Sequence, residues 1–169
     1  YKRKGEMKEE IVVLLGGRVA EKLVLDDIST GASNDIERAS NIARNMVTRY
    51  GFSEKLGPIV YGQSENEVFL GRDLGQQRDY SEEIAREIDS EVHALIESAF
   101  ERAKALLVEH RDQLDCVAEY LIENEKINGE TFEKLMKGEI APAEAEDSAA
   151  EEKAADQVDV DDLIDQIGE

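Results

Sequence analysis

Residues 7–23 have the sequence MKEEIVVLLGGRVAEKL, and this stretch decides the fold. Its apolar residues recur at steps of three and four positions, which is the period of an amphipathic helix. They are Met7, Ile11, Leu14, Leu15, Val19 and Leu23. Gly16 and Gly17 lie inside the pattern, although each costs a helix about 1 kcal/mol relative to alanine. Because glycines tolerated in a helix usually admit a close neighbour, we expect another segment to pack against this pair.

A second helix is predicted after the polar cluster of residues 29–34, where Ser33 or Asn34 can cap its first turn. Asn34 and Glu37 also have the spacing of a capping box. Gly51 is expected to end the helix, because glycine readily takes the left-handed conformation found there. The inner face is predicted to comprise Ile36, Ala39, Ala43, Met46 and Tyr50.

Three more helices are predicted towards the C-terminus. The longest begins near Ser81 and runs to about Glu109, a fourth lies around residues 114–122, and a short fifth follows Asn128-Gly129. Their inner faces are predicted to comprise Ile84, Ile88, Val92, Leu95, Ala99, Ala103 and Leu106, then Leu114, Val117, Ala118, Leu121 and Ile122, and finally Phe132, Leu135 and Met136. The fold class is therefore mainly α, a helical bundle of about five helices.

Residues 51–79 differ in character, since five glycines and Pro58 punctuate them. We expect one long irregular insertion, in which the β-prone runs 59–61 and 68–70 would form a small hairpin if they pair. A loop of this length inside a compact domain is more often functional than idle.

The chain carries 40 acidic against 20 basic residues, a formal net charge of −20. This balance argues against a nucleic-acid partner and against adhesion to anionic lipid, because both need basic patches. Residues 139–169 hold 12 of the acidic residues and a single Lys, and their Ala/Glu/Asp-rich composition favours disorder. We therefore divide the chain into a folded body, residues 1–138, and an acidic, disordered tail, residues 139–169.

No apolar run is long enough to span a bilayer, and nothing at the start is typical of a signal peptide. The chain opens on Tyr1 rather than Met, so we expect it to be a fragment, and we expect this fragment to be soluble. The lone Cys116 excludes an internal disulfide and is expected to serve as a small apolar side chain.

Signatures of catalysis are mostly missing from the sequence. There is no phosphate-binding G-x-x-x-x-G-K-[ST] and no zinc-binding H-E-x-x-H. His93 and His110 would stand about 25 Å apart on one continuous helix, so we expect each at the surface or at a helix end. Asp35 has the most unusual setting, because the start of a helix favours its ionised form. On composition alone it is more simply a helix-stabilising residue than a metal ligand.

Three segments carry a resemblance to a known family: residues 10–21 (EIVVLLGGRVAE), 29–35 (STGASND) and 46–53 (MVTRYGFS). They resemble the peptidase domain of the FtsH family, the membrane-bound ATP-dependent zinc proteases. Shorter matches are Gly57-Pro58, residues 69–73 (FLGRD) and Tyr80-Ser81. The resemblance covers residues 1–138 in order and leaves out the acidic tail.

The resemblance implies a zinc metalloendopeptidase, whose zinc is held by two histidines of an H-E-x-x-H helix and by a distant aspartate. Asp35 matches that aspartate, which reverses the interpretation from composition. The H-E-x-x-H helix, an AAA+ ATPase module that uses ATP and magnesium, and a membrane anchor are expected upstream of Tyr1. This chain would then hold one zinc ligand and no catalytic residue, and we predict that it is inactive alone.

The resemblance further implies a homo-hexameric parent protein that degrades unfolded or misassembled membrane and cytosolic proteins, with its peptidase domain in the cytoplasm or an equivalent organelle compartment. An alternative of a different class is a non-catalytic helical assembly module, and an H-E-x-x-H upstream in the reading frame discriminates between the two. An acidic partner-binding adaptor, which rests only on the tail, ranks last.

Overall fold

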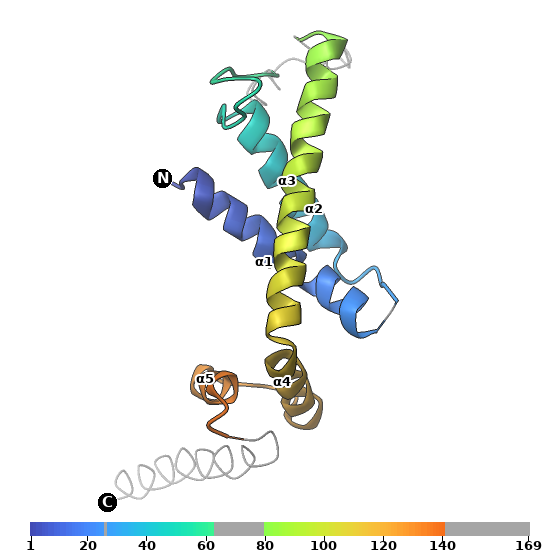
Figure 1. Cartoon of the computed structure of the whole chain (residues 1–169), viewed down its shortest axis with the longest axis vertical. Coiled ribbons are helices and arrows are strands. Elements are labelled where there is room, and N and C mark those ends of the chain that lie inside the picture. Colours follow the sequence, from blue (N-terminus) through green and yellow to red (C-terminus); the bar gives the residue numbers. More distant parts are fainter. Residues whose placement is uncertain (26, 63–79, 141–169) are drawn as a thin grey trace, which may run out of the picture. The chain divides into compact units, whose positions relative to one another are not determined.

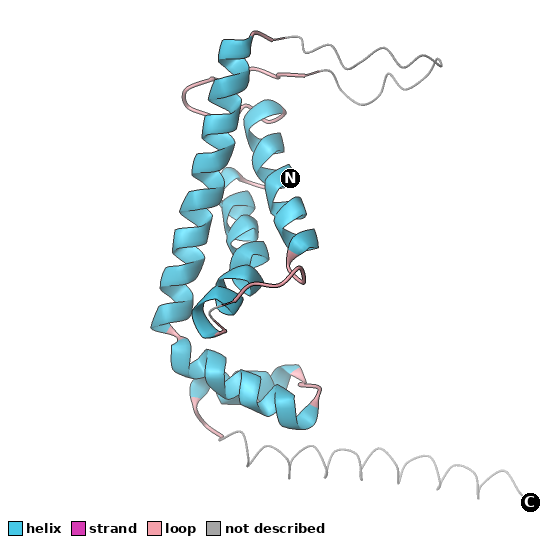
Figure 2. Cartoon of the chain, turned by 90° about the vertical axis from the view of Figure 1, so that its right-hand side faces the viewer, coloured by secondary structure: helices cyan, strands magenta, loops and turns pink. Residues whose placement is uncertain are grey.

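The computed structural model describes residues 1–25, 27–62 and 80–140, which form five α-helices and no strand (Figures 1 and 2). The helices are α1 (Lys4–Val24), α2 (Ser33–Thr48), α3 (Glu82–Glu109), α4 (Arg111–Asn124) and α5 (Gly129–Lys137). The chain divides into two compact units, of which the first is Tyr1–Val108 and the second begins at Glu109. The predicted fold class, mainly α with about five helices, is confirmed.

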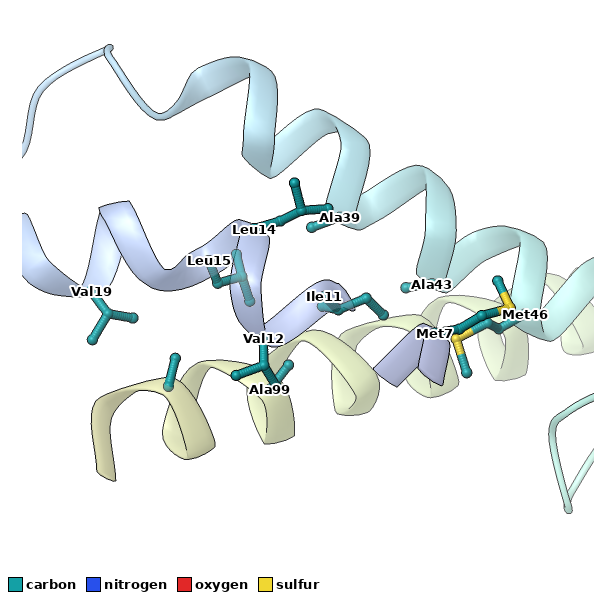
Figure 3. Packing of buried hydrophobic residues seen from close by; sticks show 11 residues of the cluster. Met7, Ile11, Val12, Leu14, Leu15, Val19, Ala39, Ala43, Met46 and Ala99 are labelled. Carbon is teal, nitrogen blue, oxygen red and sulfur yellow. The ribbon is translucent and has the colours of Figure 1, made fainter. Parts of the chain in front are cut away.

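The core of the first unit is built around α1, whose apolar stripe packs against α2 and α3. In Figure 3, Leu14 lies beside Ala39 of α2, and Val12 lies over Ala99 of α3. Alanines at these contacts let the helices approach closely, because side-chain size sets the distance between packed helices. The buried members of the cluster are Met7, Ile11, Val12, Leu14, Leu15, Val19, Ala39, Ala43, Met46, Ala99 and Ala103.

A second buried cluster joins the end of α2, the loop after it and α3; it consists of Val47, Leu56 and Ile88. A buried serine adds polar contacts to this cluster. The hydroxyl of Ser53 donates to Oε2 of Glu91 on α3 (2.7 Å) and accepts the backbone N–H of Leu56 (3.1 Å). The loop that follows α2 is therefore anchored on α3, which in turn holds the C-terminal end of α2.

The C-terminal end of α2 lies two residues earlier than its predicted inner face requires. The helix stops at Thr48, so Tyr50 lies beyond it with 51% of its surface exposed, and the prediction that Tyr50 is in the core is wrong. Gly51 does reverse the chain as expected. It takes a left-handed φ of +61°, and the next N–H, of Phe52, donates to the carbonyl of Met46 (2.9 Å).

The second unit, as far as it is described, is the pair α4 and α5. Tyr120 and Leu135 are its buried apolar residues, with Cys116 packed against them as a half-buried apolar side chain, as predicted. Asn128 caps α5 by accepting the N–H of Thr131 (2.7 Å). The predicted inner face of α4 is only partly right, since Val117 packs against this cluster but Ile122 is 81% exposed. The buried residue of α4 is Tyr120, which packs against Leu135 of α5.

Two further residues that the apolar periodicity places on inner helix faces are exposed in the structure. Leu106 on α3 and Phe132 on α5 are exposed, because Leu107 rather than Leu106 packs against the core of the first unit and Leu135 is the buried apolar residue of α5. Residues 59–61 form no strand, and the other half of the predicted hairpin, like the acidic tail, lies outside the described residues.

The surroundings of Gly16 and Gly17 in α1 also differ from the prediction. No described atom outside α1 itself comes within 4 Å of a Cβ built on Gly16 or Gly17. The close neighbour predicted for this pair is therefore not found within the described part of the chain, because Gly17 lies on the exposed side of the helix.

Replacing Gly51 by alanine tests how α2 ends. A left-handed residue with a Cβ costs roughly 1–2 kcal/mol, and here the new Cβ would also lie 2.8 Å from Cα of Pro58, which is backbone. Gly57→Ala is the matched control, since its φ is +72° but nothing lies within 4 Å of its Cβ. Urea unfolding followed by circular dichroism should show a larger loss for Gly51→Ala than for Gly57→Ala. Equal losses would contradict a packing role for Gly51.

Candidate metal centre

Asp35 lies in the first turn of α2, which begins at Ser33. Half of its side-chain surface is exposed, and its Oδ1 is 3.7 Å from a guanidinium nitrogen of Arg38, one turn further along the helix. That distance is longer than a hydrogen bond, and an exposed pair of this kind contributes at most about 1 kcal/mol. The carboxylate of Asp35 is therefore accessible and only weakly paired.

The start of α2 is set by backbone contacts rather than by a capping side chain. Ala32 occupies the N-cap position and is buried, and no side chain there accepts a hydrogen bond. The N–H of Ser33 donates to the carbonyl of Thr30 (3.1 Å), and that of Ile36 donates to the carbonyl of Ala32 (3.0 Å). The prediction that Ser33 or Asn34 caps the helix is wrong, because the helix begins at Ser33 itself.

The loop before α2 is tied to α1 through Glu21, a contact that sequence analysis missed. The hydroxyl of Ser29 donates to Oε1 of Glu21 at 2.5 Å, and its backbone N–H donates more weakly to Oε2 at 3.4 Å. Arg18, one turn earlier on α1, donates to the same Oε2 at 3.3 Å. The Ser29 hydroxyl also accepts the N–H of Gly31 (3.1 Å).

These contacts change the acidity of Glu21. The hydrogen bond from the Ser29 hydroxyl, helped by its backbone N–H and by the charge of Arg18, lowers the pKa of Glu21 below its ordinary value of 4.5. The carboxylate is therefore ionised at neutral pH and serves as an acceptor only. The periodicity of apolar residues does not predict this hydrogen bond, since Glu21 and Ser29 are eight residues apart and the end of α1 lies between them.

The other candidate ligands do not join Asp35. His93 is exposed on α3 and its Nδ1 is 3.8 Å from Oε2 of Glu97. His110, in the second unit, occupies the N-cap position of α4 and contacts Gln113 at 2.7 Å. Both agree with the prediction of a surface or helix-end histidine. Over residues 1–25, 27–62 and 80–140, no three His, Cys, Asp or Glu side chains are grouped closely enough to hold a metal ion.

The comparisons with known proteins agree on one family. A sequence model described as peptidase family M41 matches residues 1–135, which is most of the chain. The chain belongs to peptidase family M41. The segment that the family model covers ends within α5, so it includes Asp35, Glu21, the first four helices and most of the fifth.

Curated relatives in this family share the same span. The chain is 64% identical over 139 residues to the ATP-dependent zinc metalloprotease FtsH 1 of Thermoanaerobacter sp. (strain X514), covering 82% of this chain and 23% of that protein. It is 57% identical over 136 residues to the ATP-dependent zinc metalloprotease FtsH of Caldicellulosiruptor bescii, covering 80% and 22%. It is 48% identical over 137 residues to the ATP-dependent zinc metalloprotease FtsH of Bacillus subtilis, covering 80% of this chain and 22% of that protein. The family M41 chain thus spans less than a quarter of the length of these relatives.

Among the described helices, none combines the length and the apolar character needed to cross a bilayer.

The link between Glu21 and Ser29 predicts a local pH dependence. Because the pKa of Glu21 is lowered on folding, the stabilisation it provides is present above about pH 4.5 and disappears as pH falls through the lower, folded value. In an NMR titration, the amide resonances of Ser29 and Gly31 should shift with a midpoint below 4.5. In Glu21→Gln this titration should vanish. A midpoint at or above 4.5 in the unmodified chain would contradict the contact.

Proposed function

We propose that the longer protein containing this chain is a membrane-anchored, ATP-dependent zinc metalloendopeptidase, and that residues 1–138 are the C-terminal helical part of its peptidase domain. The observation that carries the proposal is the family M41 match over residues 1–135. Relatives up to 64% identical bear the name ATP-dependent zinc metalloprotease, and this chain corresponds to about a fifth to a quarter of their length. The ATPase module and membrane anchor are accordingly assigned to the parts outside this chain.

In this proposal Asp35 is the zinc ligand that the chain supplies. An ionised carboxylate oxygen is among the donors that zinc accepts, and Asp35 presents one that is half exposed and weakly paired. The sequence contains no H-E-x-x-H, so two histidine ligands and the general base are assigned to such a motif upstream of Tyr1. When bound, the zinc would lower the pKa of a water molecule in its open coordination position.

The remaining roles follow from the same assignment. The parent would act as a homo-hexamer on unfolded or misassembled membrane and cytosolic proteins, with its peptidase domain in the cytoplasm or the equivalent organelle compartment. ATP and magnesium would be used by the ATPase module, and nucleic acid is not a partner. This chain by itself would bind zinc weakly and would not cleave peptides.

Zinc titration by calorimetry tests the assignment of Asp35. A longer protein that includes the H-E-x-x-H segment should bind one zinc per protomer tightly, whereas the 169-residue chain should not. Asp35→Asn in the longer protein should weaken zinc binding by roughly 100-fold or more, since removing a residue that only supports a ligand already costs about 10–100-fold. Peptidase activity should fall in parallel.

Asp89→Asn is the matched control, because Asp89 is an exposed aspartate in a similar long ion pair, 3.8 Å from Arg44. It should leave both zinc binding and peptidase activity unchanged. Tight one-to-one zinc binding by the isolated chain, or an Asp35→Asn protein that binds zinc normally, would overturn the proposal.

A further inference from the structure

We propose that Glu21 is a positioning residue for the metal centre: it holds the loop before α2 on α1, and so fixes where Asp35 stands, without itself binding the metal. The inference rests on the proposed function, because it takes Asp35 to be a zinc ligand. It adds a role for α1 that neither the family match nor the resemblance assigns.

The carboxylate of Glu21 is already occupied by partners within the chain. Its Oε1 accepts the Ser29 hydroxyl at 2.5 Å, and its Oε2 faces both Arg18, at 3.3 Å, and the Ser29 N–H, at 3.4 Å. Binding a metal would require at least one of these contacts to break. In the part of the chain that the structure describes, Glu21 also belongs to no group of three side chains that could hold a metal ion. Both observations favour a supporting role over coordination.

A continuous series of hydrogen bonds leads from Glu21 to the start of α2. Ser29 donates its hydroxyl to Glu21 and accepts the N–H of Gly31 with the same oxygen. Space around Gly31 is tight, because a Cβ there would lie 3.2 Å from the Ser29 hydroxyl oxygen and 3.8 Å from Oε1 of Glu21. The preceding carbonyl, that of Thr30, accepts the N–H of Ser33, the first residue of α2.

The loop depends on this polar link because it buries little apolar surface. Every described residue between positions 25 and 31 is exposed, and Ile28 retains 59% of its surface area. Burial resumes only at Ala32, where the loop meets α2. Hydrophobic packing holds α2 from Ile36 onwards, because Ile36 packs against the core of the first unit and Ala39 is buried in it. Without the Glu21 contacts, the loop that leads into the turn carrying Asp35 would lose its polar attachment to α1.

Zinc binding is sensitive to such a loss, because a ligand must be held within about 0.5 Å of its productive position. Residues that orient a ligand typically change metal affinity about 10–100-fold when they are removed. The role of Glu21 therefore predicts a loss of affinity of this size, with the number of zinc ions bound per protomer unchanged.

Two measurements on the same variants test the proposal. In the isolated 169-residue chain, NMR order parameters of Ser29 and Gly31 should lie near 0.85, as in rigid backbone, and fall below about 0.6 in Glu21→Ala and in Ser29→Ala. In the longer protein, chelator competition should give zinc affinity about 10–100-fold weaker in both variants. Glu97→Ala is the control, since Glu97 is an exposed glutamate paired only loosely, at 3.8 Å, with His93.

Glu21→Gln separates positioning from coordination. Its amide oxygen can still accept the Ser29 hydroxyl, so the loop should stay ordered and zinc affinity should remain within about tenfold of the original. If Glu21 were a ligand, Glu21→Gln and Glu21→Ala would lose zinc alike while the loop of Glu21→Gln stayed ordered, and that result would overturn the proposal. Unchanged order parameters in Glu21→Ala and Ser29→Ala would overturn it as well.

The two proposals fail in different ways. If the longer protein binds no zinc, or binds it independently of Asp35, the proposed function fails and the positioning role falls with it. If zinc binding depends on Asp35 but is the same in Glu21→Ala as in the unmodified protein, only the role of Glu21 is overturned.

Discussion

The close packing of α1 against the alanines of α2 is the contact on which the first unit depends. Large side chains of α1, such as Ile11 and Leu14, are buried against positions where α2 carries only Ala39 and Ala43. Each fully buried large aliphatic side chain contributes about 1.5–3 kcal/mol, and alanine lets the two helices come near enough to gain it. A bulkier residue at Ala43 would separate the helices and displace everything that α2 carries.

Two constraints of different kind then locate Asp35. The apolar contact with α1 sets the course of α2, and in our proposal the hydrogen bonds from Glu21 through Ser29 and Gly31 hold the loop that leads into the helix. The first constraint is strong and not directional, whereas the second is weaker but specific in geometry. A carboxylate at the first turn of a helix needs both if it is to meet a metal whose other ligands come from elsewhere in the protein.

The sequence predicted the helices well because their signal is local. A repeating apolar stripe indicates that a helix exists and roughly where it ends, and the bounds of α3 agree closely with the prediction. The apolar stripe does not predict which other helix packs against it, or at which residues. The stripe therefore predicts Ile122 and Leu106 in the core, although both are exposed and the adjacent Leu107 packs against the core in place of Leu106.

The candidate site was predictable only in part. From composition alone, Asp35 is predicted to be an ordinary helix-stabilising residue. Only the resemblance of its segment to a known family predicts a chemical role for it. The contact between Glu21 and Ser29 could not be predicted, because it joins residues on either side of a helix end and depends on how the loop folds back. Loops carry much of the function of proteins, and their geometry leaves little trace in periodicity.

The central claim, that this chain contributes Asp35 to a zinc site completed by another part of the protein, is tested most directly by anomalous X-ray diffraction at the zinc edge. Crystals of the longer protein, with the H-E-x-x-H segment included, should show one zinc peak per protomer. The account predicts that a carboxylate oxygen of Asp35 lies about 2.0–2.2 Å from that peak. A zinc peak bound entirely by other residues, with Asp35 outside coordination distance, would contradict it.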